Sequence, residues 1–219
     1  MGFLRHMLQK AVYGTQGLLD MQLRDEAERG NGSTAAISAL LAQGAQLEST
    51  DMRGETALHH SLQHGTAEVQ QFLLDAGANT GARSFMGLTP LMFAARRNLA
   101  ATARILDVNA AVDDITPAAE TALMMAVDAG KIDVAQALFK AGADPAKADG
   151  YGRSALHRAL QQNQPALLVL FMPEVEARLA FIKANDISYA AAGQGVQTGR
   201  SFKPLKPLRF GNKGGAAFA

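Results

Sequence analysis

Cysteine is absent from the 219-residue chain, and long apolar runs are missing. Without cysteine there is no disulfide framework to suggest export, and a zinc site would have to rely on histidine and carboxylate ligands. The longest apolar run covers residues 166–172, well short of the roughly 20 residues that a membrane-spanning helix needs. The N-terminal residues also lack the continuous apolar stretch and cleavage site of a secretory signal. These absences favour a cytoplasmic chain without a transmembrane segment.

Motifs of common enzyme classes are missing as well. The chain contains neither a Gly-x-Ser-x-Gly nucleophile turn nor a Gly-x-x-x-x-Gly-Lys-Ser/Thr phosphate-binding loop. Its five histidines are the remaining candidates for catalysis or metal binding. His59 and His60 are adjacent, so they lie about 100° apart on a helix and do not have the i, i+4 spacing that chelates well. We therefore expect no enzymatic activity, no catalytic residue, no metal site and no cofactor.

Negative charge is absent from the end of the chain, where no acidic residue follows Asp186. Five basic residues lie in that segment: Arg200, Lys203, Lys206, Arg209 and Lys213. Because the whole chain carries +1, residues 1–186 carry a net charge of −4. The C-terminal segment is therefore electrostatically distinct from the rest.

Among the features that are present, an internal repeat organises most of the chain. A short motif with a hydroxyl residue recurs at spacings of 33, 32 and 33 residues, at Thr56, Thr89, Thr121 and Ser154. A second motif follows each of the first three, at 73–79, 105–111 and 138–144. An earlier copy at 40–46 implies a first unit whose front half, around 18–30, has lost the first motif.

Each period has the pattern of two short helices. Leu58 and Leu62, followed by Val69 and Leu73, have the three-to-four-residue spacing of helices with one buried face. Gly65 separates the two helices, where we expect a positive φ that lets the chain reverse. The hydroxyl residues are natural N-caps of the first helices, and Gly77 and Gly142 are expected to end second helices.

The period and the Thr-Ala-Leu-His motif resemble the ankyrin repeat, and residues 51–79 carry the best match. The resemblance covers residues 18–172, about five units, with the first degenerate and the third one residue short. It implies an all-α solenoid of stacked helix-turn-helix units with hairpin-like finger loops. In this family, His59 and His157 would bond back to the Thr or Ser of their own motif and help to join neighbouring repeats. His60 is expected to point toward the next helix layer.

Some positions depart from the family pattern. Asn98 stands where a glycine would separate two helices, and Asn109 replaces the glycine that ends a second helix; asparagine tolerates the left-handed conformation better than most residues. The loop at 112–120 has Ala119 in place of the turn glycine and also contains Pro117. We expect this loop to be irregular.

Segments at both ends flank the repeats. Residues 1–17 form a predicted amphipathic helix, either a cap on the first repeat or a membrane-surface or targeting helix. Residues 173–186 are predicted to form a C-terminal capping helix. Residues 187–219 have the composition of a basic, extended tail rich in glycine and proline. The tail is either a solvated segment or an arm that contacts an acidic partner surface or nucleic acid.

The family resemblance places partner binding on a concave face made of finger tips and the ends of first helices. The implied contact residues are Met52, Arg53, Phe85, Met86, Arg96, Arg97, Tyr151 and Arg153, with Gln63 and His64 at another helix end. Exposed Phe, Met, Tyr and Arg are enriched in interface hot spots. The alternative is that Phe85 and Met86 fold under their own finger and that the arginines are merely solvated.

Two non-enzymatic functions agree with these patterns. The first is a protein-binding module whose concave face recognises a partner protein and whose tail makes a second contact through Arg200, Phe202, Lys203, Lys206 and Arg209. The second is a structural subunit anchored in a larger assembly by its basic arm. Nucleic acid enters only as a contact of the tail, and the oligomeric state stays open.

Overall fold

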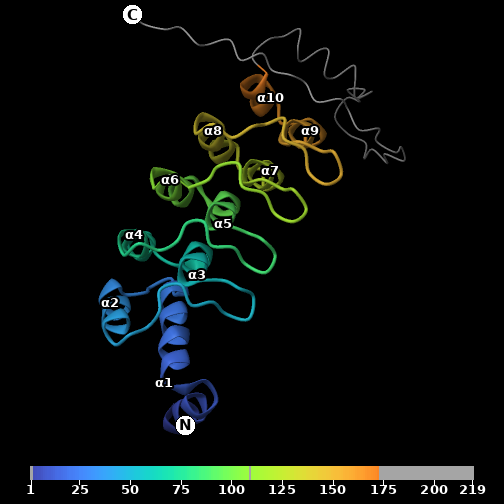
Figure 1. Cartoon of the computed structure of the whole chain (residues 1–219). Coiled ribbons are helices and arrows are strands. Elements are labelled where there is room, and N and C mark those ends of the chain that lie inside the picture. The colour runs from blue at the N-terminus through green and yellow to red at the C-terminus, as the bar shows by residue number, and fades with distance from the viewer. Residues whose placement is uncertain (1, 109, 173–219) are drawn as a thin grey trace, which may run out of the picture.

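The chain folds into two layers of helices from which a series of loops projects on one side (Figure 1). The computed structural model describes residues 2–108 and 110–172, with side chains from residue 14 onward. Within these ranges there are ten helices and no strand, apart from an isolated bridge between Ala148 and Ser154. The predicted all-α solenoid is confirmed.

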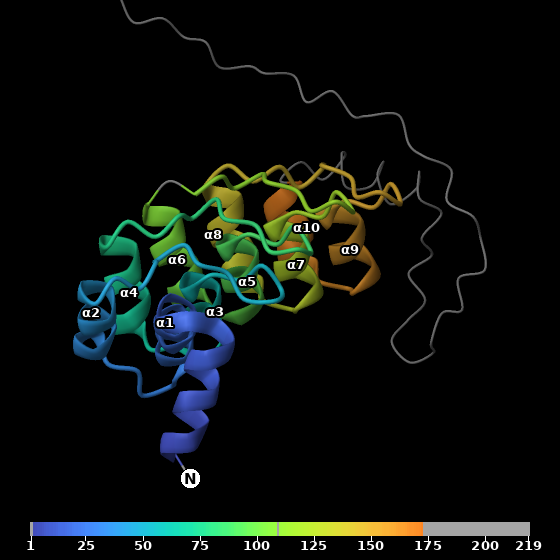
Figure 2. The same cartoon turned by 60° about the horizontal axis from the view of Figure 1, so that its bottom comes forward.

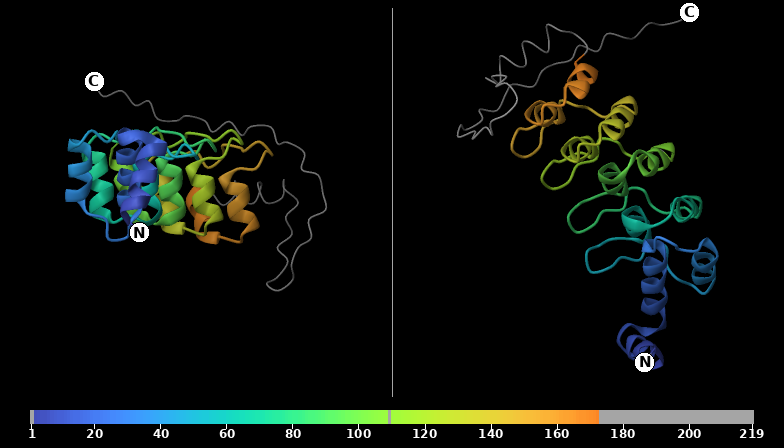
Figure 3. Two further views of the ribbon diagram at one scale, coloured as in Figure 1. Left: turned by 90° about the horizontal axis from the view of Figure 1, so that it is seen from below. Right: turned by 180° about the vertical axis from the view of Figure 1, so that it is seen from behind.

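The helices form five consecutive pairs, which correspond to the five predicted units. The inner layer, next to the loops, contains α1 (Gly2–Glu28), α3 (Ala57–His64), α5 (Pro90–Arg97), α7 (Ala122–Asp128) and α9 (Ala155–Gln161). The outer layer contains α2 (Thr34–Ala42), α4 (Ala67–Asp75), α6 (Leu99–Asp107), α8 (Ile132–Lys140) and α10 (Pro165–Phe171). Each helix contacts the next one in its layer, and the loops stay on one side in the other views (Figures 2 and 3).

Hydroxyl side chains begin the inner helices, as the repeated motif predicts. The hydroxyl oxygens of Thr89, Thr121 and Ser154 accept hydrogen bonds from the amides of Met92, Met124 and His157, at 3.4, 3.3 and 3.3 Å. Each bond satisfies an amide that has no partner within its own helix. The recurring hydroxyl therefore fixes where α5, α7 and α9 start, and with it the register of these stacked pairs.

A continuous core lies between the two layers. Its largest fully buried side chains are mostly leucine and isoleucine, at Leu23, Ile37, Leu58, Leu62, Leu73, Leu91, Ile105, Leu123, Leu138 and Leu167. Burial of each such side chain contributes roughly 1.5–3 kcal/mol. Inner helices also bury alanines, such as Ala94 and Ala126, whose small side chains let neighbouring helices approach closely. Because every unit buries its face against the next, the units stabilise one another.

Two expectations about the residues between paired helices are wrong. Gly65 has φ −67°, not a positive value. A Cβ built there would lie 2.4 Å from the Ala27 carbonyl oxygen and 2.7 Å from that of Ser61, so glycine is required by close backbone contact. Asn98 is extended, with φ −161°, and its side chain caps α6 by accepting a 2.8 Å bond from the Ala101 amide. Asn109 lies outside the described residues. Gly77 and Gly142 do have the predicted positive φ, at 86° and 98°.

Four finger loops connect α2, α4, α6 and α8 to the inner helix that follows each of them: the first (43–56), second (76–89), third (108–121) and fourth (141–154). The third finger was expected to be irregular, but its turn matches the others. The Ala119 amide donates to the Thr116 carbonyl at 2.8 Å, as the Gly87 amide donates to Ser84 at 2.8 Å in the second finger. Ala119 takes φ 60°, so it occupies the left-handed conformation that glycine has in the other turns. Tertiary contacts hold the turn despite the alanine.

Replacing Ala119 with glycine is expected to raise the free energy of unfolding by about 0.5–1 kcal/mol. The left-handed conformation costs an L-residue about 1–2 kcal/mol, and glycine removes this cost. The extra freedom of glycine in the unfolded chain offsets about half of the stability gained in this way. Chemical denaturation followed by circular dichroism measures the change. Ala118→Gly, one residue earlier and without a positive φ, is the matched control and should lower stability. Equal effects of the two substitutions would contradict the strain at Ala119.

The N-terminal helix does not end where the predicted segment 1–17 ends. α1 continues to Glu28, and its backbone is interrupted at Gly14, with φ 70° and ψ 177°. The part after Gly14 supplies the inner helix of the first unit, where Leu23 and Ala27 are buried and the helix contacts α3. The predicted C-terminal cap (173–186) and tail (187–219) lie outside the described residues.

Candidate functional site

The tips of the fingers carry most of the large apolar side chains that are exposed on the described surface. Met52 is 91% exposed, Phe85 76%, Met86 74% and Tyr151 78%. Each lies in a tight turn closed by a backbone bond, such as the 3.0 Å bond from the Gly54 amide to the Asp51 carbonyl. The alternative that Phe85 and Met86 fold under their own finger is therefore wrong. Ile115 of the third finger, 41% exposed, was not predicted.

Backbone bonds join the fingers to one another, so the tips form one continuous surface. The Phe85 amide donates to the Arg53 carbonyl at 2.8 Å, and the Gly150 amide donates to the Ala118 carbonyl at 2.9 Å. Between the second and third fingers, Arg83 donates to the Ile115 carbonyl at 2.7 Å and pairs with Asp114 at 3.0 Å. These contacts hold the tips in fixed relative positions, which favours recognition of a rigid surface.

Two of the predicted contact arginines are held within their own fingers. Arg53 lies 3.5 Å from Asp51 and 3.3 Å from Glu55. Arg153 pairs with Asp149 at 3.2 Å, and its guanidinium lies over the Tyr151 ring, 5.2 Å from the centroid. Both side chains keep part of their surface exposed, so they border the tips while stabilising the turns.

A groove of about 270 Å³ lies between α3 and α5, below the second finger. It is lined by Gln63, His64, Leu88, Met92, Phe93, Arg96 and Arg97. The groove follows the exposed side of α5 from Leu88, at the base of the finger, to the two arginines at the end of the helix. It brings together the predicted helix-end residues of two units. Sequence reasoning missed Met92 and Phe93, although the four-residue spacing to Arg96 and Arg97 places these four on one side of the helix.

Arg96 and Arg97 differ from the other arginines around the fingers. Both are exposed, and in the part of the chain that the structure describes neither forms an ion pair or a side-chain hydrogen bond. Arg53, Arg83, Arg153 and Arg158, in contrast, all pair with acidic residues. The end of the groove therefore presents two uncompensated positive charges beside the apolar edge of Phe93.

His59 has the structural role that the family resemblance implies. Its Nδ1 accepts the Thr56 amide at 3.2 Å, so Nε2 carries the proton and donates to the Leu88 carbonyl of the next unit at 3.2 Å. Burial lowers the pKa of His59 to about 4, although the bond to Leu88 opposes this effect. The imidazole is therefore neutral near pH 7. His157 repeats the local contact, with Nδ1 2.7 Å from the Ser154 hydroxyl.

A buried arginine, Arg158, forms a second network that sequence reasoning missed. Its guanidinium contacts Asp149 at 2.6 Å, Glu120 at 3.0 Å and Asp128. Burial opposes its charge, but the hydrogen bonds that the guanidinium donates to Asp149 and Glu120 outweigh burial and raise the pKa of Arg158. The repeat alignment could have shown this position, because Arg158 aligns with His60 and Asp149 with Asp51.

The expectation that His60 points toward the next helix layer is wrong. Its Nδ1 lies 3.1 Å from Glu28, at the end of α1 in the preceding unit. His60 therefore joins the second unit to the first, whereas His59 joins it to the third.

Two further predictions concern membrane-spanning helices and the C-terminal tail. No helix of the described ranges combines the length and apolar character needed to cross a membrane. The tail residues Arg200, Phe202, Lys203, Lys206 and Arg209 lie outside the described residues.

Comparison with known proteins agrees with the observed repeats. Family models described as ankyrin repeats match residues 26–114 (three copies) and 121–171 (many copies). Human neurogenic locus notch homolog protein 2 is 34% identical over 158 residues, which cover 68% of this chain and 6% of that protein. Notch homolog protein 1 of Xenopus laevis is 33% identical over 150 residues, or 65% of this chain and 6% of that protein. The chain thus spans a small part of the length of these relatives.

Proposed function

The chain belongs to the ankyrin-repeat family, whose repeats mediate protein–protein interaction, and we propose that it binds a partner protein through the finger tips and the α3–α5 groove. The observation that carries this proposal is that Arg96 and Arg97, exposed at the end of a groove lined by Phe93, form no ion pair with any residue that the structure describes. Phe85 and Met86 are exposed at the tip of the second finger, beyond the other end of the groove. Together they favour a partner segment with acidic groups and apolar anchors.

The chemistry of the surface supports binding. Phe85 and Met86 lie on a finger that is bonded to its neighbours, so little conformational freedom is lost when a partner covers them. Guanidinium groups without acidic partners lose no existing ion pair when they meet a carboxylate. We therefore place the centre of the interface between the second finger tip and the end of α5, with Met52, Arg53, Tyr151 and Arg153 at its edges.

Charge reversal at the groove should weaken partner binding by more than about tenfold, because each lost hot-spot contact costs more than about 1 kcal/mol. The test uses a photo-reactive amino acid at Phe85 or Arg97, in the cells that produce the protein. Both positions should cross-link to the same protein, and Arg96→Glu with Arg97→Glu should remove the cross-link from Phe85.

Outer-layer positions provide the controls for this experiment. Val169 on α10 and Ile132 on α8 are exposed but lie away from the fingers, so they should not cross-link to that protein. Lys140→Glu, at the exposed end of α8, is the matched charge reversal and should leave the cross-link unchanged. Equal cross-linking from the outer positions would refute the proposed face.

The basic tail is proposed as a second contact with the same partner, on the basis of its charge alone. A chain that ends at residue 198 should bind more weakly and with less sensitivity to salt, because the tail charges no longer contribute. Complete loss of binding on truncation, with no effect of Arg96→Glu and Arg97→Glu, would instead favour a structural subunit anchored by its arm.

A further inference from the structure

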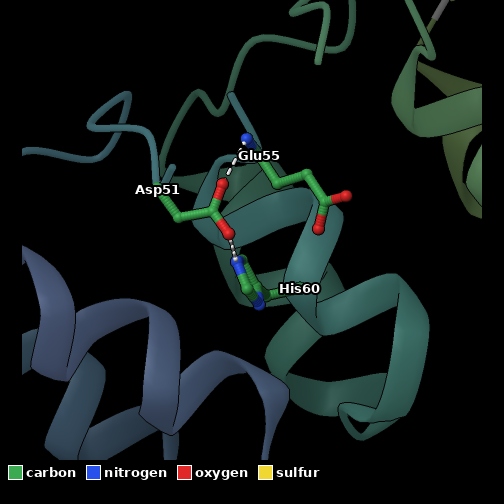
Figure 4. A group of neighbouring side chains, drawn as sticks. All are labelled: Asp51, Glu55 and His60. Carbon is green, nitrogen blue, oxygen red and sulfur yellow. Dashed lines mark hydrogen bonds and ion pairs between the residues drawn. The ribbon is translucent and has the colours of Figure 1, made fainter. Parts of the chain in front are cut away.

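A group of three carboxylates surrounds the buried imidazole of His60, where the first two units meet. His60 belongs to α3 and is only 7% exposed. Glu28 comes from the end of α1, while Asp51 and Glu55 come from the first finger. Figure 4 shows Asp51 and Glu55 beside the imidazole. One nitrogen or oxygen atom from each of Asp51, Glu55 and His60 lies within 4.8 Å of the others.

The hydrogen bond to Glu28 fixes how the imidazole presents its second nitrogen. Nδ1 lies 3.1 Å from Glu28 Oε2, and because a carboxylate only accepts, Nδ1 carries the proton. In the neutral ring, Nε2 then has a free lone pair. This atom is buried and has no hydrogen-bond partner among the described residues, and it faces Asp51 Oδ2 at 3.4 Å. Two lone pairs that face each other repel unless a cation lies between them.

Asp51 keeps one of its two carboxylate oxygens available for a further contact. Its Oδ1 accepts bonds from the amides of Arg53 and Glu55, at 2.8 and 2.9 Å. Within the described ranges, its Oδ2 has only a long, 3.5 Å contact with Arg53 besides His60. The carboxylate oxygen that faces His60 is thus weakly satisfied.

The fifth unit has a different residue at the position that His60 occupies in the second unit. Arg158 replaces His60 there, and Asp149 replaces Asp51, with 2.6 Å between the guanidinium and the carboxylate. A permanent positive charge therefore fills this position in the fifth unit. In the second unit, Arg53 is the only arginine or lysine that pairs with the three carboxylates among the described residues, and it lies at the exposed rim. The site keeps an excess of negative charge.

We propose that this cluster binds a zinc ion through His60 Nε2, Asp51 Oδ2 and a carboxylate oxygen of Glu55, with water as the fourth ligand. Zinc–nitrogen and zinc–oxygen bonds of about 2.0–2.2 Å place tetrahedral ligands about 3.3–3.6 Å apart, which agrees with the 3.4 Å between Nε2 and Oδ2. Glu28 orients the imidazole from its other nitrogen, as a carboxylate does behind many zinc-bound histidines. The absence of cysteine leaves one nitrogen and two oxygens as ligands, a set that zinc accepts.

The bound ion fixes the junction between the first two units. It connects the first finger to α3, and through Glu28 it also holds α1 in place. Ligands that bind only the folded state stabilise it in proportion to the logarithm of their concentration. Zinc therefore raises the thermal stability of the protein, and its effect is largest at this junction. Arg53 moves away from Asp51 and Glu55 when the ion binds, which its 62% exposed side chain allows.

The test is titration of the full, untagged chain with zinc chloride after removal of metals with a chelator. Calorimetry should show one site, and zinc should raise the melting temperature, whereas magnesium and calcium should not. In long-range ¹H–¹⁵N spectra, the His60 Nε2 signal should shift on zinc addition. Asp51→Asn and Glu55→Gln keep hydrogen-bond acceptors, and each should weaken zinc binding at least about 100-fold. This loss is larger than the roughly 10–100-fold that is typical for a residue such as Glu28, which contacts a ligand and not the ion itself.

Two variants separate loss of the ion from loss of the fold. His60→Arg copies the fifth unit, so it should abolish zinc binding while keeping or raising the stability of the metal-free protein. His64→Gln, at the exposed end of the same helix, should bind zinc normally. Zinc binding that is undetectable in the natural chain, or that survives His60→Arg, would overturn the proposal.

Discussion

Replacing Arg158 with alanine is expected to lower the free energy of unfolding by about 3–5 kcal/mol. The side chain is 4% exposed and contacts Asp149, Glu120 and Asp128. Asp149 is itself buried, and hydrogen bonds from the Arg153 amide and Arg158 outweigh burial and lower its pKa. Without the guanidinium, a buried carboxylate is left without its main counter-charge. Urea denaturation followed by circular dichroism measures the loss.

Arg153 provides a control for this prediction because it pairs with the same carboxylate from the exposed side. Its ion pair with Asp149 is 3.2 Å long, and its side chain is about 40% exposed. Arg153→Ala should therefore cost less than about 1 kcal/mol. Arg158→Lys keeps the charge but cannot donate to three carboxylates at once, so its cost should be intermediate. Similar losses for Arg158→Ala and Arg153→Ala would show that burial of the pair matters little.

Replacing Gly65 with alanine is expected to cost about 1–3 kcal/mol or more, although alanine suits the φ of −67° found there. All three atoms nearest to the added Cβ belong to the backbone: the carbonyl oxygens of Ala27 and Ser61 and the Cα of Ser61. Backbone cannot rotate away as a side chain can, so α1 and α3 must separate. Chemical denaturation gives the loss, and hydrogen exchange should show weaker protection in these two helices.

Gly77→Ala distinguishes crowding from backbone strain. Gly77 has φ 86°, and no atom lies within 4 Å of the Cβ that alanine would add. Its substitution therefore tests the left-handed conformation alone, at a cost of about 1–2 kcal/mol with no local effect on α1. If Gly65→Ala costs less than Gly77→Ala and leaves hydrogen exchange in α1 unchanged, close contact is not the reason for glycine at position 65.

The local features of the repeat could be predicted from the sequence because short-range interactions determine them. The hydroxyl at each helix start bonds an amide three residues later, and Gly77 ends a helix through its own φ. The exposure of Phe85 and Met86 follows from their place in a tight turn. The 33-residue period therefore predicted the five units correctly.

Several predictions failed where contacts between units decide the outcome. Glycine is required at position 65 because the Ala27 carbonyl of the preceding unit lies close to it. The turn at Ala119 is held by the neighbouring fingers. The groove at Arg96 and the cluster at His60 each combine residues from two units.

The sequence by itself determined the repeat, the helix ends and the residues of the core, since these depend on groups a few positions apart. Only the tertiary structure decided which charges are neutralised. Arg158 meets Glu120 from 38 positions away and His60 meets Glu28 from 32, while Arg96 and Arg97 meet no acid in the described ranges. The stacking of one unit on the next sets these distances, and electrostatic energies depend on distance and burial, not on the order of residues along the chain.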